Sequence, residues 1–143
     1  MDVSVILPTY NEAQNIVPLI EAIELQLDGA GIRYEVVVVD DNSPDGTADQ
    51  VRERFGDDPA VRLLVRTQGR GLATAIAYGI RHAQGDSVAV MDTDFNHDPA
   101  MLPQMVRFLE YYDIIIGSRF VMGGGMEELW RYNASFVFNL FVR

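Results

Sequence analysis

Apolar and polar residues alternate along the chain in two distinct patterns. Short apolar runs rich in β-branched residues are typical of strands, whereas longer stretches repeat apolar residues at helical spacing. One such stretch places Ile16, Leu19, Ile20, Ile23 and Leu27 on one helical face. The pattern predicts strands at Val3–Leu7, Tyr34–Val39, Val61–Val65, Ser87–Met91 and Asp113–Ile116. It predicts helices at Ala13–Leu27, Thr47–Phe55, Leu72–Ala83 and Ala100–Tyr111.

The strict alternation of strands and helices predicts the fold class. The second strand contains four consecutive valines, as expected for a strand buried on both faces of a sheet. Strands that are separated by helices pair in parallel, and the helices pack on both faces of the sheet. We therefore expect a Rossmann-like α/β fold with a mostly parallel sheet. A chain of 143 residues is long enough for its own core.

The chemically interesting polar residues follow the predicted strands. They occupy positions 8–12, 40–47, 66–71, 92–98 and 117–120, each directly after one strand. In a parallel sheet the carboxyl ends of the strands share one edge, and ligands bind in the crevice there. The pattern therefore predicts one binding site that is built from five loops.

The strongest signal in these loops is the pair Asp92 and Asp94, separated by Thr93. Oxygen ligands suit a hard divalent ion such as Mg²⁺ or Mn²⁺, and the chain contains no cysteine. Such an ion would bridge the oxygens of a diphosphate and neutralise charge on a departing nucleotide. A solvated pair of carboxylates that caps a turn is the alternative. The buried strand before the pair and the residues 95–99 after it favour a metal.

Two other loops carry groups that suit a nucleotide. Asp41 ends a buried strand, where its carboxylate needs a partner such as a base N–H or a ribose hydroxyl. Tyr10 offers a ring that can lie against a base, and Glu12 offers a carboxylate that can accept hydrogen bonds. Both loops also have structural alternatives, because Asn11 could cap the first helix and Asp45 could close a turn.

Some residues of these loops have other expected roles. We expect Asp45 and Thr47 to be structural, since they precede and open a helix. Gly69 and Gly71 would let the backbone approach a ligand closely. Arg119, in the loop after the fifth predicted strand, could stabilise a diphosphate or an acceptor phosphate through its planar guanidinium.

Composition restricts the partners. The formal net charge is −10, and all 11 basic residues are arginines. Such a chain lacks the positive footprint that nucleic acid phosphates need, so we expect no nucleic acid partner. The first residues lack the layout of a secretory signal, and no run reaches the ~18 apolar residues of a membrane span. A cytoplasmic location is therefore the expectation.

Taken together, the motifs resemble the family 2 glycosyltransferases, and within them the dolichol-phosphate (polyprenyl-phosphate) mannosyltransferase-like branch. The resemblance runs from Val3 to Arg143. The segments that carry it are 4–12, 38–47, 117–120 and 123–125, together with the spacing of Trp130, Arg131, Ser135 and Asn139.

The resemblance implies a GT-A fold and a metal-dependent, inverting transfer of a hexose. The donor would be a nucleotide sugar, GDP-mannose first and UDP-glucose second, with Mg²⁺ or Mn²⁺ as cofactor. The acceptor would be a polyprenyl or dolichyl phosphate, whose oxygen is already anionic and needs little help from a general base.

The resemblance also assigns roles to individual residues. The residues that would hold the nucleoside are Pro8, Tyr10, Glu12, Val39 and Asp41. Asp92, Thr93 and Asp94 would lie at the metal and the diphosphate, with Arg119 and Arg131 near the phosphates. Asp94 and Arg119 would act in catalysis. The branch often has Gln where this chain has Asn96, so Asn96 would be a metal ligand directly or be replaced by a water.

The resemblance divides the chain into two parts. Residues 1–122 would form the nucleotide-sugar-binding catalytic domain, and residues 123–143 a flexible glycine loop and an apolar C-terminal helix. The segment Ser135–Val142 is mostly apolar but too short to span a bilayer. We expect it to begin an acceptor or membrane-proximal region that contacts the cytoplasmic face of a membrane or self-associates. An ordinary core helix is the alternative.

Two other functions stay open at this point. A family 2 transferase that acts on a sugar hydroxyl would need an additional catalytic carboxylate. An inactive nucleotide-sugar-binding module would need only the donor site. Neither alternative changes the predicted fold or the predicted donor residues.

Overall fold

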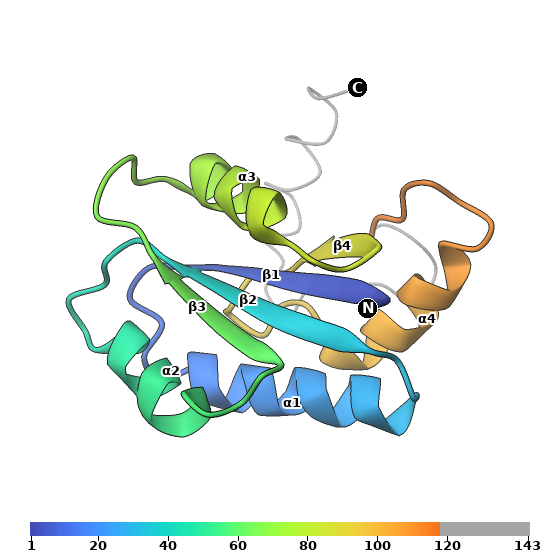
Figure 1. Cartoon of the computed structure of the whole chain (residues 1–143), viewed down its shortest axis with the longest axis horizontal. Coiled ribbons are helices and arrows are strands. Elements are labelled where there is room, and N and C mark those ends of the chain that lie inside the picture. The colour runs from blue at the N-terminus through green and yellow to red at the C-terminus, as the bar shows by residue number, and fades with distance from the viewer. Residues whose placement is uncertain (118–143) are drawn as a thin grey trace, which may run out of the picture. The chain divides into compact units, whose positions relative to one another are not determined.

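Within residues 1–117, which the computed structural model describes, four parallel strands form a sheet in the order β3-β2-β1-β4 (Figure 1). The strands are β1 (Val3–Thr9), β2 (Tyr34–Asp40), β3 (Val61–Val65) and β4 (Ser87–Val90). The helices are α1 (Ile16–Gly29), α2 (Thr47–Phe55), α3 (Leu72–His82), the 3₁₀ helix η1 (Pro99–Met101) and α4 (Leu102–Phe108). The predicted mostly parallel α/β sheet is confirmed.

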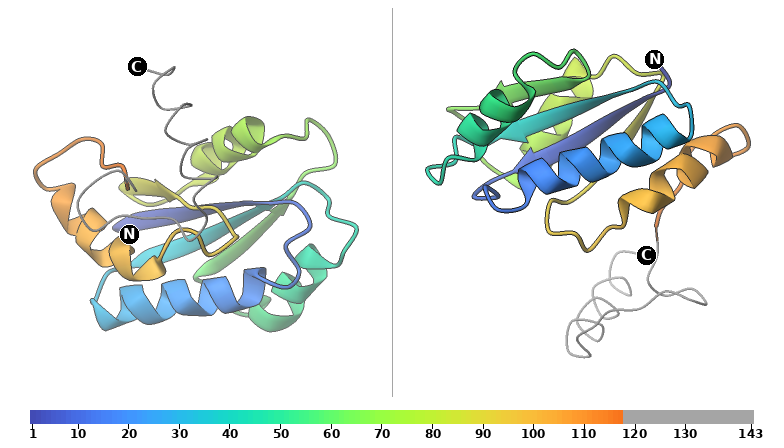
Figure 2. Two further views of the ribbon diagram at one scale, coloured as in Figure 1. Left: turned by 180° about the vertical axis from the view of Figure 1, so that it is seen from behind. Right: turned by 90° about the horizontal axis from the view of Figure 1, so that it is seen from below.

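Helices cover both faces of this sheet, as predicted. Figure 1 shows α3 on one side and α1 and α2 on the other, and Figure 2 shows α4 beside α1. Successive residues of a strand point to opposite faces. In β1, Val3, Val5 and Leu7 therefore pack on the α1 side, whereas Ile6 packs on the α3 side.

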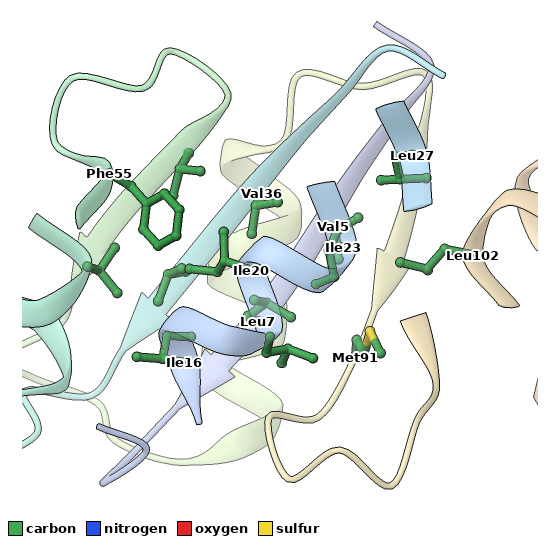
Figure 3. Packing of buried hydrophobic residues seen from close by; sticks show 14 of the residues in the cluster. Val5, Leu7, Ile16, Ile20, Ile23, Leu27, Val36, Phe55, Met91 and Leu102 are labelled. Carbon is green, nitrogen blue, oxygen red and sulfur yellow. The ribbon is translucent and has the colours of Figure 1, made fainter. Parts of the chain in front are cut away.

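The larger core lies between the sheet and α1. The helical face predicted from the sequence is fully buried, and it consists of Ile16, Leu19, Ile20, Ile23 and Leu27. Figure 3 shows Ile16, Ile20, Ile23 and Leu27 of this face together with Val5, Leu7 and Val36 of the sheet. Phe55, Met91 and Leu102 belong to the same cluster. Burial of a large aliphatic side chain stabilises a fold by about 1.5–3 kcal/mol, so this face holds α1 in place.

The second core is smaller and brings α3 very close to the sheet. It joins Ile6, Val37 and Val39 of the sheet to Ala75 of α3. A Cβ atom on Gly79 would lie 2.5 Å from Ile6 Cγ2 and 3.1 Å from Val39 Cγ2. The absence of a side chain at Gly79 therefore permits this close packing of helix on sheet.

A buried carboxylate anchors the other end of α3. Glu35, on β2, is almost fully buried and accepts hydrogen bonds from Ser4 Oγ (2.6 Å), Gln84 N (2.6 Å) and Arg62 Nη1 (2.7 Å). The same Arg62 atom donates to the His82 carbonyl oxygen, 2.9 Å away. One charged side chain thus connects three strands to the C-terminus of α3.

Three predicted elements differ from the structure. Residues 113–116 do not form a strand, and Ile114 and Ile116 are 78% and 81% exposed. A four-residue apolar run has strand propensity, but a strand also requires a partner in a hydrogen-bonded ladder. The first helix begins at Ile16 rather than Ala13, because a turn closed by the Glu12 carbonyl precedes it.

The last predicted helix is also shorter than expected. Asp98 caps η1 by accepting a hydrogen bond from Ala100 N, and α4 ends at Phe108. No helix among residues 1–117 is long and apolar enough to cross a membrane. The predicted glycine loop and apolar segment of residues 123–143 lie outside the described residues.

Replacement of Gly79 by Ala should lower the free energy of unfolding by about 1 kcal/mol. Overpacking of a core costs about 1–3 kcal/mol, whereas Gly→Ala in a helix ordinarily gains up to about 1 kcal/mol. Gly29→Ala is the matched control, because a Cβ there would meet no atom within 4 Å. Urea unfolding measures both variants, and equal stability of the two would contradict the close packing at Gly79.

Acid should destabilise the fold partly through Glu35. Burial raises the pKa of Glu35, but hydrogen bonds from Ser4, Arg62 and the Gln84 amide together lower it below the ordinary value of 4.5. A carboxyl group with a lowered pKa stabilises the folded state above its unfolded pKa, and this contribution is lost as the pH falls.

The free energy of unfolding should therefore decline between about pH 5 and pH 3, and Glu35→Gln should make this decline smaller. The comparison is urea unfolding at each pH. Glu53→Gln on the exposed face of α2 serves as the control and should keep the wild-type slope. An identical slope for Glu35→Gln and the wild type would contradict this role of Glu35.

Candidate functional site

The carboxyl ends of the four strands lie at one edge of the sheet. The register pairs Thr9 with Asp40 and Asp40 with Val65, and Met91 N donates to the Ile6 carbonyl oxygen at 3.1 Å. Figure 1 shows the loops after β1, β2 and β3 gathered at the end of the sheet away from the N-terminus. The predicted meeting of these loops at one edge is confirmed for the first four strands.

A cleft of about 470 Å³ opens at this edge between the loops and the start of α3. Its lining residues are Pro8, Thr9, Tyr10, Asp41, Arg70, Gly71, Leu72 and Ala75. Small-molecule sites have volumes of about 300–1,000 Å³ and combine apolar walls with a few polar groups. Three of the predicted nucleoside-binding residues, Pro8, Tyr10 and Asp41, therefore line a cleft of suitable size.

Asp41 forms a buried ion pair with Arg66, and both side chains are only 7% exposed. Arg66 Nε donates to Asp41 Oδ1 at 2.7 Å, and Nη2 contacts the same oxygen. The Gly71 amide donates to the other oxygen, Oδ2, at 2.8 Å. The partner that this buried carboxylate requires is therefore supplied, at least in part, by the protein itself.

The role of Arg66 was not predicted from the sequence. The residue belongs to the polar segment 66–71, but no function was expected of its side chain. A single arginine after a strand has no distinctive spacing, so only the three-dimensional proximity to Asp41 identifies the pair. The sequence did offer one clue: a buried carboxylate such as that of Asp41 requires a nearby positive charge.

Arg70 and Tyr10 face each other in the cleft. The Arg70 guanidinium carbon lies 5.5 Å from the centroid of the Tyr10 ring, within range of a cation–π interaction. The Tyr10 side chain is 48% exposed, so its ring is accessible to a ligand. Arg70 lines the cleft, although the sequence had indicated no role for its side chain.

The loop after β1 is held by side chains of the loop after β2. Three successive backbone amides, those of residues 11–13, donate in turn to Ser43 Oγ (2.9 Å), Thr47 Oγ1 (3.0 Å) and Asp45 Oδ2 (3.0 Å). Asp45 Oδ1 also accepts from Thr47 N at 3.0 Å and from Thr47 Oγ1 at 2.6 Å. The predicted structural roles of Asp45 and Thr47 are confirmed.

Two other predicted donor-binding residues do not line this cleft. Glu12 is partly buried, and its Oε2 accepts a hydrogen bond from Asn15 Nδ2 at 3.0 Å. The Val39 side chain belongs to the core under α3. Asp40, which precedes Asp41, is fully buried and accepts hydrogen bonds from Ser43 N (2.9 Å) and Ser43 Oγ (2.6 Å), so it shapes the turn.

The loop after β4 presents two exposed carboxylates. Asp92 and Asp94 are exposed, whereas Thr93 between them is buried. Asn96 N donates to Asp94 Oδ1 at 3.0 Å, and Asn96 Nδ2 contacts Oδ2 of the same side chain. Asp92 N donates a hydrogen bond to His97 Nδ1 at 3.4 Å. This loop leaves the same sheet edge as the cleft, although it does not contribute to the cleft lining.

The donor atoms of this loop fit a hard divalent cation. Asp92, Asp94 and Asn96 all offer side-chain oxygens, which Mg²⁺ and Mn²⁺ prefer. Over the described part of the chain, no cluster of three or more His, Asp or Glu side chains forms a complete metal cage. Mg²⁺ is commonly bound by one or two carboxylates together with substrate phosphates, so a pair is sufficient.

Arg119 and Arg131, which were expected near the phosphates, lie outside the described residues. The same holds for the other motif residues after Gly117, including Ser118, Phe120, Trp130, Ser135 and Asn139. Their contribution to the site stays a prediction.

A parallel sheet with a ligand cleft at its carboxyl edge is the arrangement of nucleotide-binding α/β proteins. Residues 4–142 match the model of the glycosyl transferase family 2, and the chain belongs to this family. The family resemblance read from the motifs is thereby confirmed.

Two relatives of this chain are dolichol-phosphate mannosyltransferases. The protein of Pyrococcus furiosus is 43% identical over 129 residues, which cover 90% of this chain and 36% of the relative. The protein of Saccharomyces cerevisiae is 33% identical over 131 residues, which cover 91% of this chain and 49% of the relative. The chain therefore spans less than half the length of either relative.

Solved structures confirm the GT-A fold. A mannosyltransferase from Pyrobaculum calidifontis in complex with GDP-Man and Mn²⁺ has a TM-score of 0.58 and 38% identity, over 75% of this chain and 32% of that one. Glucosyl-3-phosphoglycerate synthase from Mycobacterium tuberculosis, in complex with Mg²⁺ and UDP, has a TM-score of 0.59 and 28% identity. That match covers 76% of this chain and 39% of the synthase.

Removal of the Thr47 hydroxyl should weaken the connection between the two loops. Thr47→Val would leave the Glu12 amide without its hydrogen-bond acceptor and remove one of the three hydrogen bonds that Asp45 accepts. We expect a cost of about 1–3 kcal/mol in the free energy of unfolding. Thr67→Val is the matched control, because Thr67 is exposed. Chemical unfolding measures the difference, and a Thr47→Val variant as stable as Thr67→Val would contradict the proposed connection.

Proposed function

We propose that this protein transfers a hexose from a nucleotide sugar to a polyprenyl phosphate, with inversion at the anomeric carbon. One observation carries the proposal: a cleft lined by Tyr10, Asp41 and Arg70 lies at the same sheet edge as a loop with two exposed carboxylates. GDP-mannose is the first candidate donor and UDP-glucose the second. The relatives named dolichol-phosphate mannosyltransferase and the mannosyltransferase in complex with GDP-Man support mannose as the first candidate sugar.

The cleft would hold the nucleoside of the donor. The exposed ring of Tyr10 offers a surface for the base, and the Arg70 guanidinium beside it could donate to base or ribose oxygens. Asp41 Oδ2 accepts one hydrogen bond, from Gly71, and a carboxylate oxygen can accept a second from a ribose hydroxyl or a base N–H. These groups bind and orient the donor but take no part in bond formation.

The loop after β4 would hold the diphosphate through a divalent ion. Asp92 and Asp94 supply two carboxylates, and the Asn96 amide, which contacts Asp94, supplies a third oxygen. A bound Mg²⁺ or Mn²⁺ would act as a Lewis acid on the leaving diphosphate. Buried Thr93 separates the two carboxylates and keeps both of them at the surface, where a diphosphate can reach them.

The reaction itself needs little further chemistry from the protein. A phosphate oxygen of the acceptor is anionic, so it can attack the anomeric carbon without a strong general base. Direct attack from the side opposite the leaving diphosphate inverts the configuration at that carbon. Arg119 and Arg131 are the proposed partners of the phosphates, and the mostly apolar segment Ser135–Val142 is proposed to contact the cytoplasmic face of a membrane.

A binding panel tests the metal site directly. With Mn²⁺ present, GDP-mannose should raise the melting temperature of the wild type, because a ligand that binds only the native state stabilises it. Asp94→Ala should lose the metal-dependent part of this shift and keep the melting temperature of the free protein. The same panel with UDP-glucose identifies the preferred donor.

Asp57→Ala is the control for this panel. It removes one exposed carboxylate after α2, away from the loop of β4, with the same change in net charge. A metal-dependent shift that survives in Asp94→Ala would remove Asp94 from the site.

Transfer assays with a polyprenyl phosphate and with a free sugar then separate the proposed acceptor from a sugar hydroxyl. Donor binding without transfer to either would indicate a binding module.

A further inference from the structure

A single buried guanidinium connects the elements around the donor cleft. Arg66 pairs with Asp41, and its Nη2 donates to the Gly71 carbonyl oxygen at 3.3 Å. The guanidinium carbon lies 5.9 Å from the centroid of the Tyr78 ring on α3. The Arg66 backbone amide donates to the Asp40 carbonyl oxygen at 2.8 Å. Arg66 therefore contacts the ends of β2 and β3 and the first turns of α3.

These contacts determine how the Asp41 carboxylate is placed. One oxygen accepts from the Arg66 guanidinium and the other from the Gly71 amide, so the plane of the carboxylate is held from two sides. Without Arg66, a carboxylate that is 7% exposed would lack its counter-charge. An unpaired buried charge is strongly unfavourable, so Asp41 would turn toward water and change its position in the cleft.

The same guanidinium also holds the loop that carries Arg70. Gly71 contacts the Arg66–Asp41 pair through both its N–H and its carbonyl oxygen. Thr74 Oγ1 completes the loop by donating to the carbonyl oxygens of Gly69 (2.7 Å) and Gly71 (2.8 Å). Because Arg70 lies between these two glycines, the loop conformation determines where its guanidinium lies relative to Tyr10.

We infer that Arg66 is the positioning residue of the donor cleft, which places both Asp41 and Arg70 for the nucleoside without contacting the nucleoside itself. Arg66 does not belong to the cleft lining; it lines a neighbouring groove of about 450 Å³ together with Arg81 and Tyr78. The inference rests on the proposed function, because it concerns the nucleotide-sugar donor. It adds a residue that binds no part of the substrate.

Lysine cannot replace arginine in this role. The planar guanidinium donates along several fixed directions, and here it reaches both the Asp41 carboxylate and the Gly71 carbonyl oxygen. A lysine ammonium keeps the charge but carries it on one atom at the end of a flexible chain. Arg66→Lys should therefore keep the ion pair and lose the placement of the loop.

The test compares donor binding by Arg66→Lys, Arg66→Met and the wild type, measured by calorimetric titration of GDP-mannose and UDP-glucose with Mn²⁺. Arg66→Lys should weaken donor binding about tenfold, because it loses the fixed geometry of the guanidinium. Arg66→Met should weaken donor binding more strongly, because it loses both this geometry and the positive charge. In transfer assays the donor KM should rise while kcat stays within about twofold, as expected when ground-state and transition-state binding weaken equally.

Arg81→Lys and Arg81→Met are the matched controls. Arg81 is exposed and lines the same groove as Arg66 but makes no ion pair with Asp41. Both controls should bind the donor within about twofold of the wild type. Melting temperatures show whether each variant is folded. If Arg66→Met does not fold, Arg66→Lys against Arg81→Lys decides the question.

The outcomes separate the two proposals. A folded Arg66→Lys variant that binds the donor as tightly as Arg81→Lys overturns the positioning role and leaves the proposed function intact. An equal loss in both lysine variants also overturns it, because the effect would then reflect the charge of the groove. A wild-type protein that binds neither nucleotide sugar overturns the proposed function and, with it, this inference.

Discussion

Parallel pairing of β1 with β2 on one side and β4 on the other sets the arrangement of the sheet, of its two cores and of the cleft. All seven residues of β1 are buried, and their side chains alternate between the two cores. A one-residue slip in register would exchange the side chains of the two faces, so the register is strongly specified. Parallel pairing in this register brings the loops after the four strands to one edge. The site exists because of that pairing.

Helix α3 shows how this constraint reaches the cleft. Its first turn is held through Gly71 to the Asp41–Arg66 pair. At its other end, Glu35 on β2 accepts a hydrogen bond from Gln84 N just after the helix, and Arg62 connects Glu35 to the His82 carbonyl oxygen. Between the two carboxylates, Gly79 lets the helix lie directly on the sheet. The cleft is therefore lined by the start of a helix that is held to the sheet at both of its ends.

More of the framework than of the site could be predicted from the sequence. Periodicity identified four strands and the buried face of α1, because burial imposes a spacing on a strand or a helix. It failed at residues 113–116, which have strand propensity but form no strand among the described residues. Motif reasoning selected Pro8, Tyr10 and Asp41 for the cleft, yet it missed Arg66 and Arg70, which follow no periodic pattern.

The fold class, the family and the edge of the sheet that carries the cleft follow from the sequence alone. Alternating patterns and loop motifs are local properties, and they can be read along the chain. Which charges meet follows only from the folded arrangement of the strands. Asp41 and Arg66 are separated by 25 positions, and their ion pair arises because β2 and β3 are neighbours in the sheet. Contact between distant residues depends on strand order, which no local pattern encodes.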